Sequence, residues 1–429
     1  MPGRSTGKPH RALLVTSVLP WPLHRNGGAQ RTDLLRQALE RAGYAVEILA
    51  VLPQSAPALP DWDELRAHGV VATFTFDATT VIRPRPRLSP PGFGSLWALD
   101  HVRRVWRHRY APHADAARWV NERADRYALV VSRYLQTALV AGLDRRNPVE
   151  EPRVLVDLDD VDWLTLESRF RAQPWPGLSG KLGMMIARRT VRQRCVRSLP
   201  AFNRLFVTNA DDEAELRRLG QSPVLLLNIP YADQDDPERL VPLAPSAPPA
   251  RDVLFVGDLE FGPNVTGLDW FLDHCWSGVR QEVPDANLRI VGRGLTEQRR
   301  QAWGQRPGVD VVGFAENLRS EYERCACTIA PTWWGGGTKI KLVESAALGR
   351  ACVATPHARR GYDDLGRGPS SPVVTAGDAR AFSAAVIDLL LRPASRQARE
   401  VAGAVLVQHR YSFPAFARVV AEAVRSAVR

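Results

Sequence analysis

The chain has 429 residues, of which 45% are hydrophobic and 24% are charged, and its formal net charge at pH 7 is +11. This length predicts two domains of about 200 residues each. No window approaches the roughly 20 uninterrupted apolar residues of a spanning helix, which indicates a soluble globular protein rather than a membrane-spanning one. The positive charge favours anionic partners, and it leaves nucleotides, phospholipid headgroups and nucleic acid open.

The N-terminal segment and the cysteines indicate the compartment. The apolar run after the basic N-terminus extends only from Ala12 to Val15, and no small-residue cleavage site follows it. We therefore interpret this run as a first core strand rather than a signal peptide. The five cysteines are scattered, and Cys325 and Cys327 lack a second pair at zinc spacing, which favours reduced structural thiols. Together these features predict a cytoplasmic protein.

The first part of the chain has the pattern of a βαβ unit. A short apolar strand from Ala12 to Thr16 precedes a glycine loop with Gly27 and Gly28, and a helix with one apolar face follows before a strand from Tyr44 to Leu52. In open α/β sheets ligands bind at the carboxyl edge, where such a loop lies. We predict that Gly27, Gly28 and Arg31 line a binding cleft for the acceptor there; the alternative for the two glycines is a plain tight turn. Further strands are predicted at 70–76, 127–132, 154–156 and 204–208.

Two basic stretches, 96–121 and 181–197, are helical in composition. Each is either an ordinary solvated helix face or a surface that meets an anionic acceptor or the inner face of a membrane. Peripheral membrane contact is therefore an alternative to a purely cytoplasmic location.

Four carboxylates, Asp157, Asp159, Asp160 and Asp162, end the strand at 154–156. Because burying unpaired carboxylates is costly, such a cluster faces solvent, caps a helix or takes part in chemistry. Overlapping Asp-x-Asp pairs are also the hard oxygen ligands that Mg²⁺ and Mn²⁺ prefer, but this motif is weak. We expect the cluster to cap the following helix and to face a cleft, with no metal bound.

The second half restarts the alternation of strands and helices after a proline-rich linker at 236–250. Strands are predicted at 253–256, 287–291, 309–312, 327–330 and 351–355, and helices at 265–279, 316–324, 379–391, 395–409 and 413–429. The sequence therefore predicts an α/β protein with two Rossmann-like domains facing each other across a deep interdomain cleft. The domains span 1–235 and 251–412, and the helix at 413–429 packs back on the first.

The stretch from Pro331 to Thr355 carries the strongest chemical signal. Gly335, Gly336 and Gly337 run into Thr338 and a helix, and such a loop offers backbone N–H groups and the positive end of a helix dipole to an anion. Three polar side chains, Thr338, Lys341 and Glu344, recur at intervals of three and should share one helical face. Trp333 and Trp334 are interpreted as packing residues that line the cleft, and contact of either ring with a sugar is the alternative.

The second half resembles the retaining GT-B glycosyltransferases, in the large group 1 (family 4-like) family that includes bacterial capsule, lipopolysaccharide and exopolysaccharide sugar transferases. The resemblance covers about 110 residues in the family's order and spacing. Its marks are Phe255 to Asp258 (FVGD), Gly262 to Asn264 (GPN), Val291 and Gly292, Val312 to Phe314 (VGF), Gly335 to Glu344 (GGGTKIKLVE), Gly349, and Val353 to Thr355 (VAT). In the first half only Gly27, Gly28, the aspartate cluster and Asn228 match.

The resemblance implies where a nucleotide sugar binds. Glu344 should accept hydrogen bonds from the ribose, the backbone of Val312, Gly313 and Phe314 should meet the base, and Gly335 to Thr338 should approach the diphosphate and the sugar. Gly257, Asn264 and Gly292 belong to the same donor site. Lys341 can neutralise the leaving diphosphate, which is the main electrostatic task in glycosyl transfer.

Two departures from the family pattern affect this assignment. The family commonly has a second glutamate eight positions before Glu344, where this chain has Gly336. The usual Arg and Lys after the first strand of the domain are also missing, and Asp258 and Asn264 occupy that region. The missing positive charge would have to come from elsewhere, and we name Lys339, Arg293 and Arg31 as candidates.

The resulting prediction is a retaining, metal-independent glycosyltransferase that uses no cofactor. It would move a sugar from a nucleotide-diphosphate sugar to a saccharide, lipid-linked or small-molecule acceptor, in polysaccharide or glycoconjugate biosynthesis. Lys341 and Glu344 are predicted to act at the donor, and Asp160 or Asp162 to orient the acceptor. A catalytically inactive nucleotide-sugar-binding or regulatory protein and an Asp-x-Asp metal-dependent transferase remain alternatives. Nucleic-acid binding is not expected, because the arginines do not interleave with aromatics in a known module.

Overall fold

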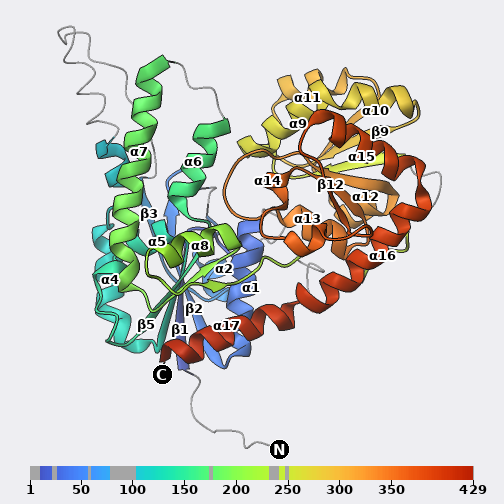
Figure 1. Ribbon diagram of the computed structural model, residues 1–429. Coiled ribbons are helices and arrows are strands. Elements are labelled where there is room, and N and C mark those ends of the chain that lie inside the picture. Colours follow the sequence, from blue (N-terminus) through green and yellow to red (C-terminus); the bar gives the residue numbers. More distant parts are fainter. Residues whose placement is uncertain are drawn as a thin grey trace, which may run out of the picture. The chain divides into compact units, whose positions relative to one another are not determined.

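The computed structural model of the protein describes residues 10–21, 27–56, 59–77, 103–172, 177–230, 241–246 and 251–428, with only the backbone at 177–180. The chain divides into two compact units (Figure 1). Unit 1 comprises Met1–Leu226 and Ala417–Arg429, and unit 2 comprises Leu227–Phe416.

Unit 1 is built on a seven-stranded sheet in the order β3-β2-β1-β4-β5-β6-β7, and every pairing is parallel. The strands are β1 (His10–Thr16), β2 (Tyr44–Pro53), β3 (Val70–Phe76), β4 (Leu129–Arg133), β5 (Arg153–Asp159), β6 (Arg204–Val207) and β7 (Val224–Leu225). The central strands are nearly continuous apolar runs because helices cover both faces of a parallel sheet. The predicted α/β class is confirmed for this unit.

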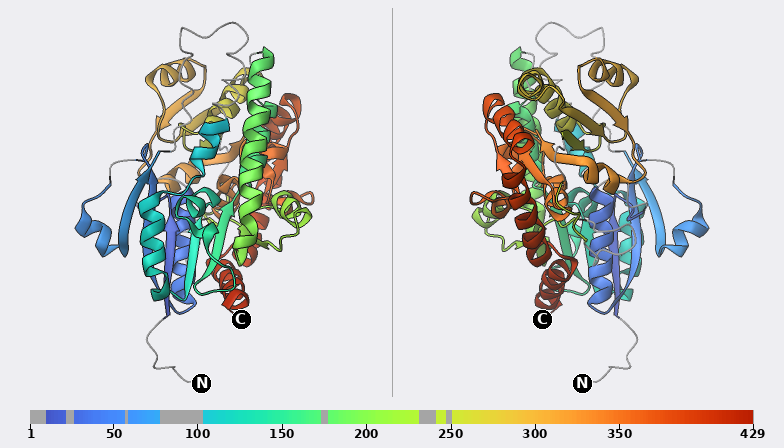
Figure 2. Two further views of the ribbon diagram at one scale, coloured as in Figure 1. Left: turned by 90° about the vertical axis from the view of Figure 1, so that its left-hand side faces the viewer. Right: turned by 90° about the vertical axis from the view of Figure 1, so that its right-hand side faces the viewer.

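The helices of unit 1 follow its strands along the chain. They are α1 (Gly27–Arg41), α2 (Trp62–Ala67), α4 (Ala114–Arg123), α5 (Leu135–Val140), α6 (Asp162–Ala172), α7 (Gly177–Ser198) and α8 (Ala210–Arg218). Side chains that accept a backbone N–H cap α2 at Asp61 and α8 at Asn209. The long helix α7, green in Figures 1 and 2, exposes Leu182 and Met185 beside basic residues.

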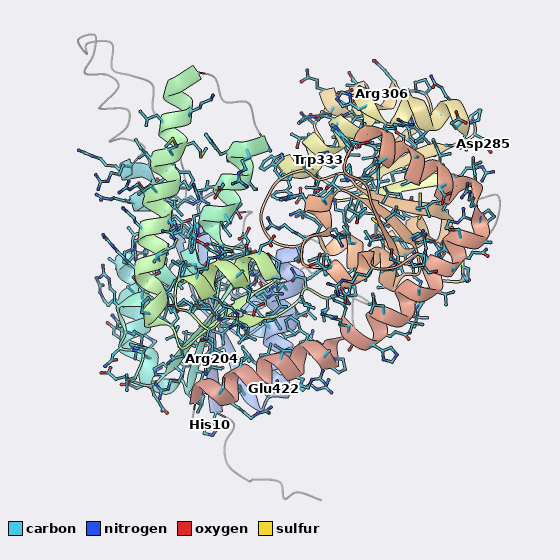
Figure 3. All side chains as sticks on the ribbon, in the orientation of Figure 1. His10, Arg204, Asp285, Arg306, Trp333 and Glu422 are labelled. Carbon is cyan, nitrogen blue, oxygen red and sulfur yellow. The ribbon has the colours of Figure 1, made fainter. Side chains whose placement is uncertain are left out.

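The last helix, α17 (Phe413–Val428), buries Phe416, Val420 and Val424 along one face. Arg204, at the start of β6 and labelled in Figure 3, lies near α17. It donates from Nε to the Ser426 hydroxyl at 3.0 Å and from Nη2 to the Ser426 carbonyl at 3.2 Å. These bonds join α17 to the sheet of unit 1.

Unit 2 contains a six-stranded parallel sheet in the order β10-β9-β8-β11-β12-β13. The strands are β8 (Asp252–Val256), β9 (Asn287–Val291), β10 (Val309–Gly313), β11 (Cys325–Ala330), β12 (Ala351–Ala354) and β13 (Val373–Thr375). The order reverses at β8, and ligands of such sheets bind beyond the carboxyl ends of the strands at such a point.

The helices of unit 2 alternate with these strands. They are α9 (Gly262–His274), α10 (Trp276–Glu282), α11 (Glu297–Gly304), α12 (Leu318–Arg324), α13 (Ile340–Ala347), α14 (Pro356–Arg359), α15 (Ala379–Leu391) and α16 (Pro393–Arg410). Phe255, Phe271 and Phe382 are fully buried in the main core of this unit. All five cysteines are buried and free.

Several elements differ from the sequence predictions. The apolar stripe predicted as one helix over 265–279 forms two helices that break at Cys275. The short helices α2, α11 and α14 were not predicted. In the described part of the basic stretch 96–121, the helix at 103–109 ends before α4 begins at Ala114. Gly27 and Gly28 form the first turn of α1 rather than a loop.

No helix in the described part of the chain is long and apolar enough to cross a membrane.

Candidate active site

The candidate donor site lies at the carboxyl edge of the unit 2 sheet. The segments that follow β8, β9, β10 and β11 carry the residues predicted to bind the donor, and parallel strands end at a common edge. These segments are 257–264, 292–293, 314 and 335–339, and the last two residues of β10, Val312 and Gly313, belong to the same edge.

Among the predicted glycines, Gly292 is required by close backbone approach and Gly313 by its backbone conformation. The Gly257 amide donates to the Val291 carbonyl at 3.0 Å, and the Gly292 amide donates to the Gly313 carbonyl at 2.8 Å. A Cβ placed on Gly292 would lie 1.8 Å from the Gly257 carbonyl oxygen. Gly313 has a φ of +78°, which disfavours other residues. These glycines therefore allow the ends of β8, β9 and β10 to pack together.

Lys341 reaches the segment after β8. Its Nζ donates to Asn264 Oδ1 at 2.9 Å and lies 4.1 Å from the centroid of the Phe255 ring. A Cβ on Gly257 would come within 2.9 Å of this Nζ. Burial, and secondly the charge of Lys339, lower the pKa of Lys341 to about 7. Three residues predicted separately, Gly257, Asn264 and Lys341, thus contact one another.

The neighbouring charges form a second contact group. Asn264 donates from Nδ2 to the Asp258 carbonyl at 2.8 Å, and Arg293 Nη2 lies 3.3 Å from Asp258 Oδ2. Arg293, one of the three cations named as candidates for the missing positive charge, is therefore paired with Asp258. Lys341 is the cation that contacts Asn264.

Glu344 lies one helical turn after Lys341 on α13. Its Oε2 accepts a hydrogen bond from the Tyr322 hydroxyl at 3.0 Å, and burial raises its pKa. Thr338 does not share this helix, because α13 begins at Ile340 with Lys339 as its N-cap. The Thr338 hydroxyl instead accepts from Asn228 Nδ2 at 2.8 Å. The predicted common face therefore holds only for Lys341 and Glu344.

The glycine loop before α13 has the backbone conformations that its sequence indicates. Gly335 has a φ of +109° and Gly337 a φ of +60°. Lys339 Nζ donates to the Gly336 carbonyl at 2.6 Å, and His357 Nε2 lies 3.0 Å from the Gly335 carbonyl. Sequence reasoning missed His357, since no motif marks it.

The two tryptophans before the loop pack against α9. Trp334 donates from Nε1 to the Thr266 hydroxyl at 2.9 Å, and the Trp333 ring makes an edge contact with Trp270 at 4.8 Å between centroids (Figure 3 labels Trp333). Phe314, predicted to flank the base, is 57% exposed. Val312 is partly buried against a small cluster that includes Tyr322.

In unit 1, Arg31 is buried on α1 rather than projecting from it. Its Nε and Nη2 donate to the two carboxylate oxygens of Asp157 at 2.8 and 2.7 Å, and Nη2 also reaches the Leu226 carbonyl at 3.2 Å. Arg133 lies 3.1 Å from the same carboxylate. Asp157 is thus held between two buried arginines.

Asp160 and Asp162 accept hydrogen bonds from hydroxyl groups. Asp160 Oδ2 accepts from the Thr165 hydroxyl at 2.9 Å, and Asp162 Oδ2 accepts from the Tyr110 hydroxyl at 2.8 Å. Burial, followed by the charges of nearby aspartates, raises the pKa of Asp160 to about 8. Burial also raises the pKa of Asp162. At the start of α6, the Val161 amide donates to the Asp212 carboxylate at 3.3 Å.

Two non-glycine residues at the carboxyl edge of the unit 1 sheet, Tyr134 after β4 and Asp159 at the end of β5, have φ values of 68° and 61°. Such conformations are strained and are concentrated at functional sites. Within the described residues, no group of three or more His, Cys, Asp or Glu side chains is arranged to hold a metal ion.

The family model of the group 1 glycosyl transferases matches residues 250–392, about one third of the chain. A curated relative, an uncharacterised 44.6 kDa protein in the cps region of Klebsiella pneumoniae, is 28% identical over 144 residues. This match covers 32% of the chain and 36% of the relative, so it spans only about a third of each protein.

Solved structures of GT-B glycosyltransferases share the fold over most of the chain. Anabaena HepE, in complex with UDP and glucose, has a TM-score of 0.58 at 15% identity, covering 97% of this chain and 100% of that one. A mutant of S. aureus TarM, in complex with Fondaparinux, α-GlcNAc-glycerol and UDP, has a TM-score of 0.55 at 8% identity. That match covers 72% of this chain and 58% of TarM, so the chain spans less than two thirds of TarM's length.

Proposed function

We propose that the chain transfers a sugar from a nucleotide-diphosphate sugar to an acceptor. The proposal is supported by the match of residues 250–392 to the group 1 glycosyl transferase family model and by the GT-B fold. We assign retention of the anomeric configuration and independence from metal ions to this reaction. The acceptor, a saccharide, a lipid-linked sugar or a small molecule, binds mainly to unit 1. The product enters polysaccharide or glycoconjugate biosynthesis.

The observation that carries this proposal is the pairing of a cation and a carboxylate on one helix beside a glycine loop. Lys341 contacts Asn264 and approaches Gly257, and Glu344 lies one turn further along α13 against Tyr322. A cation beside backbone amides suits a diphosphate, and a carboxylate suits the paired hydroxyls of a ribose. Two structural relatives were solved with UDP, which supports a nucleotide at this site.

The residues suggest how the chain assists the transfer. Lys341 stabilises the negative charge that develops on the leaving diphosphate, and the amides of the glycine loop share this task. The acceptor attacks from the face that the diphosphate leaves, and the departing phosphate takes the acceptor proton. This route needs no enzyme nucleophile, and none of the site residues forms the nucleophile and base pair of covalent catalysis. Asp160 or Asp162 orients the acceptor.

A thermal-shift panel tests this assignment. UDP-, GDP-, ADP- and dTDP-sugars are compared on the wild type and on Glu344→Ala, because a ligand that binds only the native state raises its apparent stability. We expect one donor to stabilise the wild type and to have a much smaller effect on the variant. Equal shifts in both proteins would contradict the ribose assignment.

Turnover separates this proposal from its alternatives. A catalytically inactive binding protein would bind a donor but neither transfer nor hydrolyse its sugar. A metal-dependent transferase would lose activity in chelator, whereas we expect activity in EDTA to remain within about twofold of its value without chelator.

A further inference from the structure

His357 connects two neighbouring segments of the donor site. It lies in α14, directly after β12, and its Nε2 is 3.0 Å from the carbonyl oxygen of Gly335 in the loop after β11. These two strands are adjacent in the sheet. Because a carbonyl oxygen only accepts hydrogen bonds, the imidazole Nε2 must carry the hydrogen of this contact.

A second donor holds the next carbonyl of the loop. Lys339 Nζ lies 2.6 Å from the Gly336 carbonyl, and Lys339 is only 7% exposed. In a planar trans peptide the C=O of one residue and the N–H of the next point in opposite directions. Binding the carbonyls of Gly335 and Gly336 therefore turns the N–H groups of Gly336 and Gly337 away from His357 and Lys339.

The loop needs such support because glycine restricts its own backbone very little. Gly335 and Gly337 both have positive φ, at +109° and +60°. Many other conformations are open to a run of three glycines, and each one misdirects the amides. Successive backbone N–H groups in this kind of turn form an anion-binding concavity only when their orientation is fixed.

The protonation state of His357 agrees with a donor role. Burial, followed by the charges of Lys339 and Arg360, lowers its pKa to about 4, and its bonds to backbone carbonyls offset only part of this effect. The ring is therefore neutral at physiological pH and donates from Nε2 without gaining or losing a proton.

We propose that His357 is a positioning residue for sugar transfer: by donating to the Gly335 carbonyl, it holds the glycine loop so that its amides bind the donor diphosphate. This inference rests on the proposed function, since it concerns the same donor. Lys339 has the matching duty at Gly336 and is a support of the loop rather than a direct phosphate ligand.

The test compares binding of a donor with binding of its nucleoside alone, by titration calorimetry at pH 7.5. For His357→Ala we expect a Kd for the donor about tenfold above that of the wild type, with an unchanged Kd for the nucleoside, because in the proposed binding mode the nucleoside does not contact the loop. His357→Gln keeps an amide N–H donor and should remain within about threefold of the wild type. His409→Ala, at an exposed position of α16, is the matched control and should leave both constants unchanged.

Four outcomes would overturn the proposal. They are an unchanged donor Kd in His357→Ala, an equal loss of nucleoside affinity in that variant, a His357→Gln variant as weak as His357→Ala, and a wild type that binds no donor. The last outcome also refutes the proposed function, whereas the first three leave that function intact. If His357→Ala does not fold, His357→Gln and the wild type still decide the question, since a Gln variant more than about tenfold weaker contradicts the donor role.

Discussion

Donor binding should be linked to the protonation of Lys341. In the free protein the pKa of this ammonium is lowered to about 7, because it is buried above the Phe255 ring and beside the charge of Lys339. A bound diphosphate brings negative charge next to Nζ and raises this pKa. Near neutral pH the protein must therefore take up a proton when it binds the donor.

The size of the effect follows from this pKa. Only protein molecules with a protonated Lys341 bind the diphosphate strongly. Their fraction falls from about nine tenths at pH 6 to about one tenth at pH 8. If the bound-state pKa lies above 8, affinity should fall about tenfold between these pH values. About half a proton should be taken up per donor bound at pH 7.

Calorimetric titration at pH 6, 7 and 8 measures the donor affinity and the number of protons taken up on binding. A nucleotide-diphosphate sugar is the right ligand, because its diphosphate has no group that titrates in this range. Buffers with different ionisation enthalpies give the proton uptake. Lys341→Arg keeps the charge at every pH and should remove the pH dependence, and Lys341→Met should bind weakly at all three values.

A wild-type Kd that is equal at pH 6 and pH 8 would refute this reasoning. So would an Arg variant that keeps the wild-type slope, because the titrating group would then be another residue.

Three further predictions concern stability and surface contacts. Gly292→Ala should lower the free energy of unfolding by about 3 kcal/mol, because its Cβ would meet the Gly257 carbonyl. Gly278→Ala on α10 is the control, because a Cβ there meets no atom within 4 Å. Equal denaturant midpoints for Gly292→Ala and the control would contradict this prediction. The raised pKa of Asp160 means that the native state holds a proton that the unfolded state loses above about pH 4, so wild-type stability should fall as pH rises toward about 8. Because Asp160→Asn cannot ionise, its melting temperature minus that of the wild type should increase from pH 5 to pH 8. A difference in melting temperature that stays constant over this range would argue against the raised pKa of Asp160. Replacing the exposed Leu182 and Met185 of α7 by Ser should reduce co-flotation with vesicles rich in anionic lipid if this helix contacts a membrane, and unchanged flotation would remove that role.

The sequence predicted strands better than short helices, because the residue pattern within a buried strand is distinctive and that within a short polar helix is not. Buried parallel strands are apolar runs bounded by glycine or polar residues, so β2 and β8 were located within one residue of their observed ends. The helix α11 is mostly polar and buries only Trp303, which leaves no periodic stripe to detect. Length also matters, since α2 has six residues and lies in a proline-rich stretch.

Within the candidate site, the sequence identified residues that are close in the chain but not their distant partners. The glycine loop, Lys341 and Glu344 form one segment whose residue types indicate its chemistry. Tyr322 lies on α12 and His357 on α14, and only the fold of unit 2 brings these side chains to this segment.

Arg31 shows the same limit more strongly. A single arginine on a predicted helix carries no sign that it will be buried, and its partner Asp157 lies 126 residues away. Because a buried charge requires a compensating partner, this ion pair can be recognised only when both residues are located in the fold.

The position of Lys341 suggests how the chain compensates for its departure from the family pattern. Asn264 lies in the region where the resembling family has a basic side chain after the first strand, and Lys341 from α13 donates to this amide. Lys341 lies three residues before Glu344 on the same helix, α13. The proposed phosphate and ribose contacts then depend on one element, so a shift of α13 would weaken both together. If the cation were on a separate loop, its loss would not move the carboxylate. Because both groups are on α13, we predict that substitutions of Lys341 and Glu344 act non-additively on donor affinity.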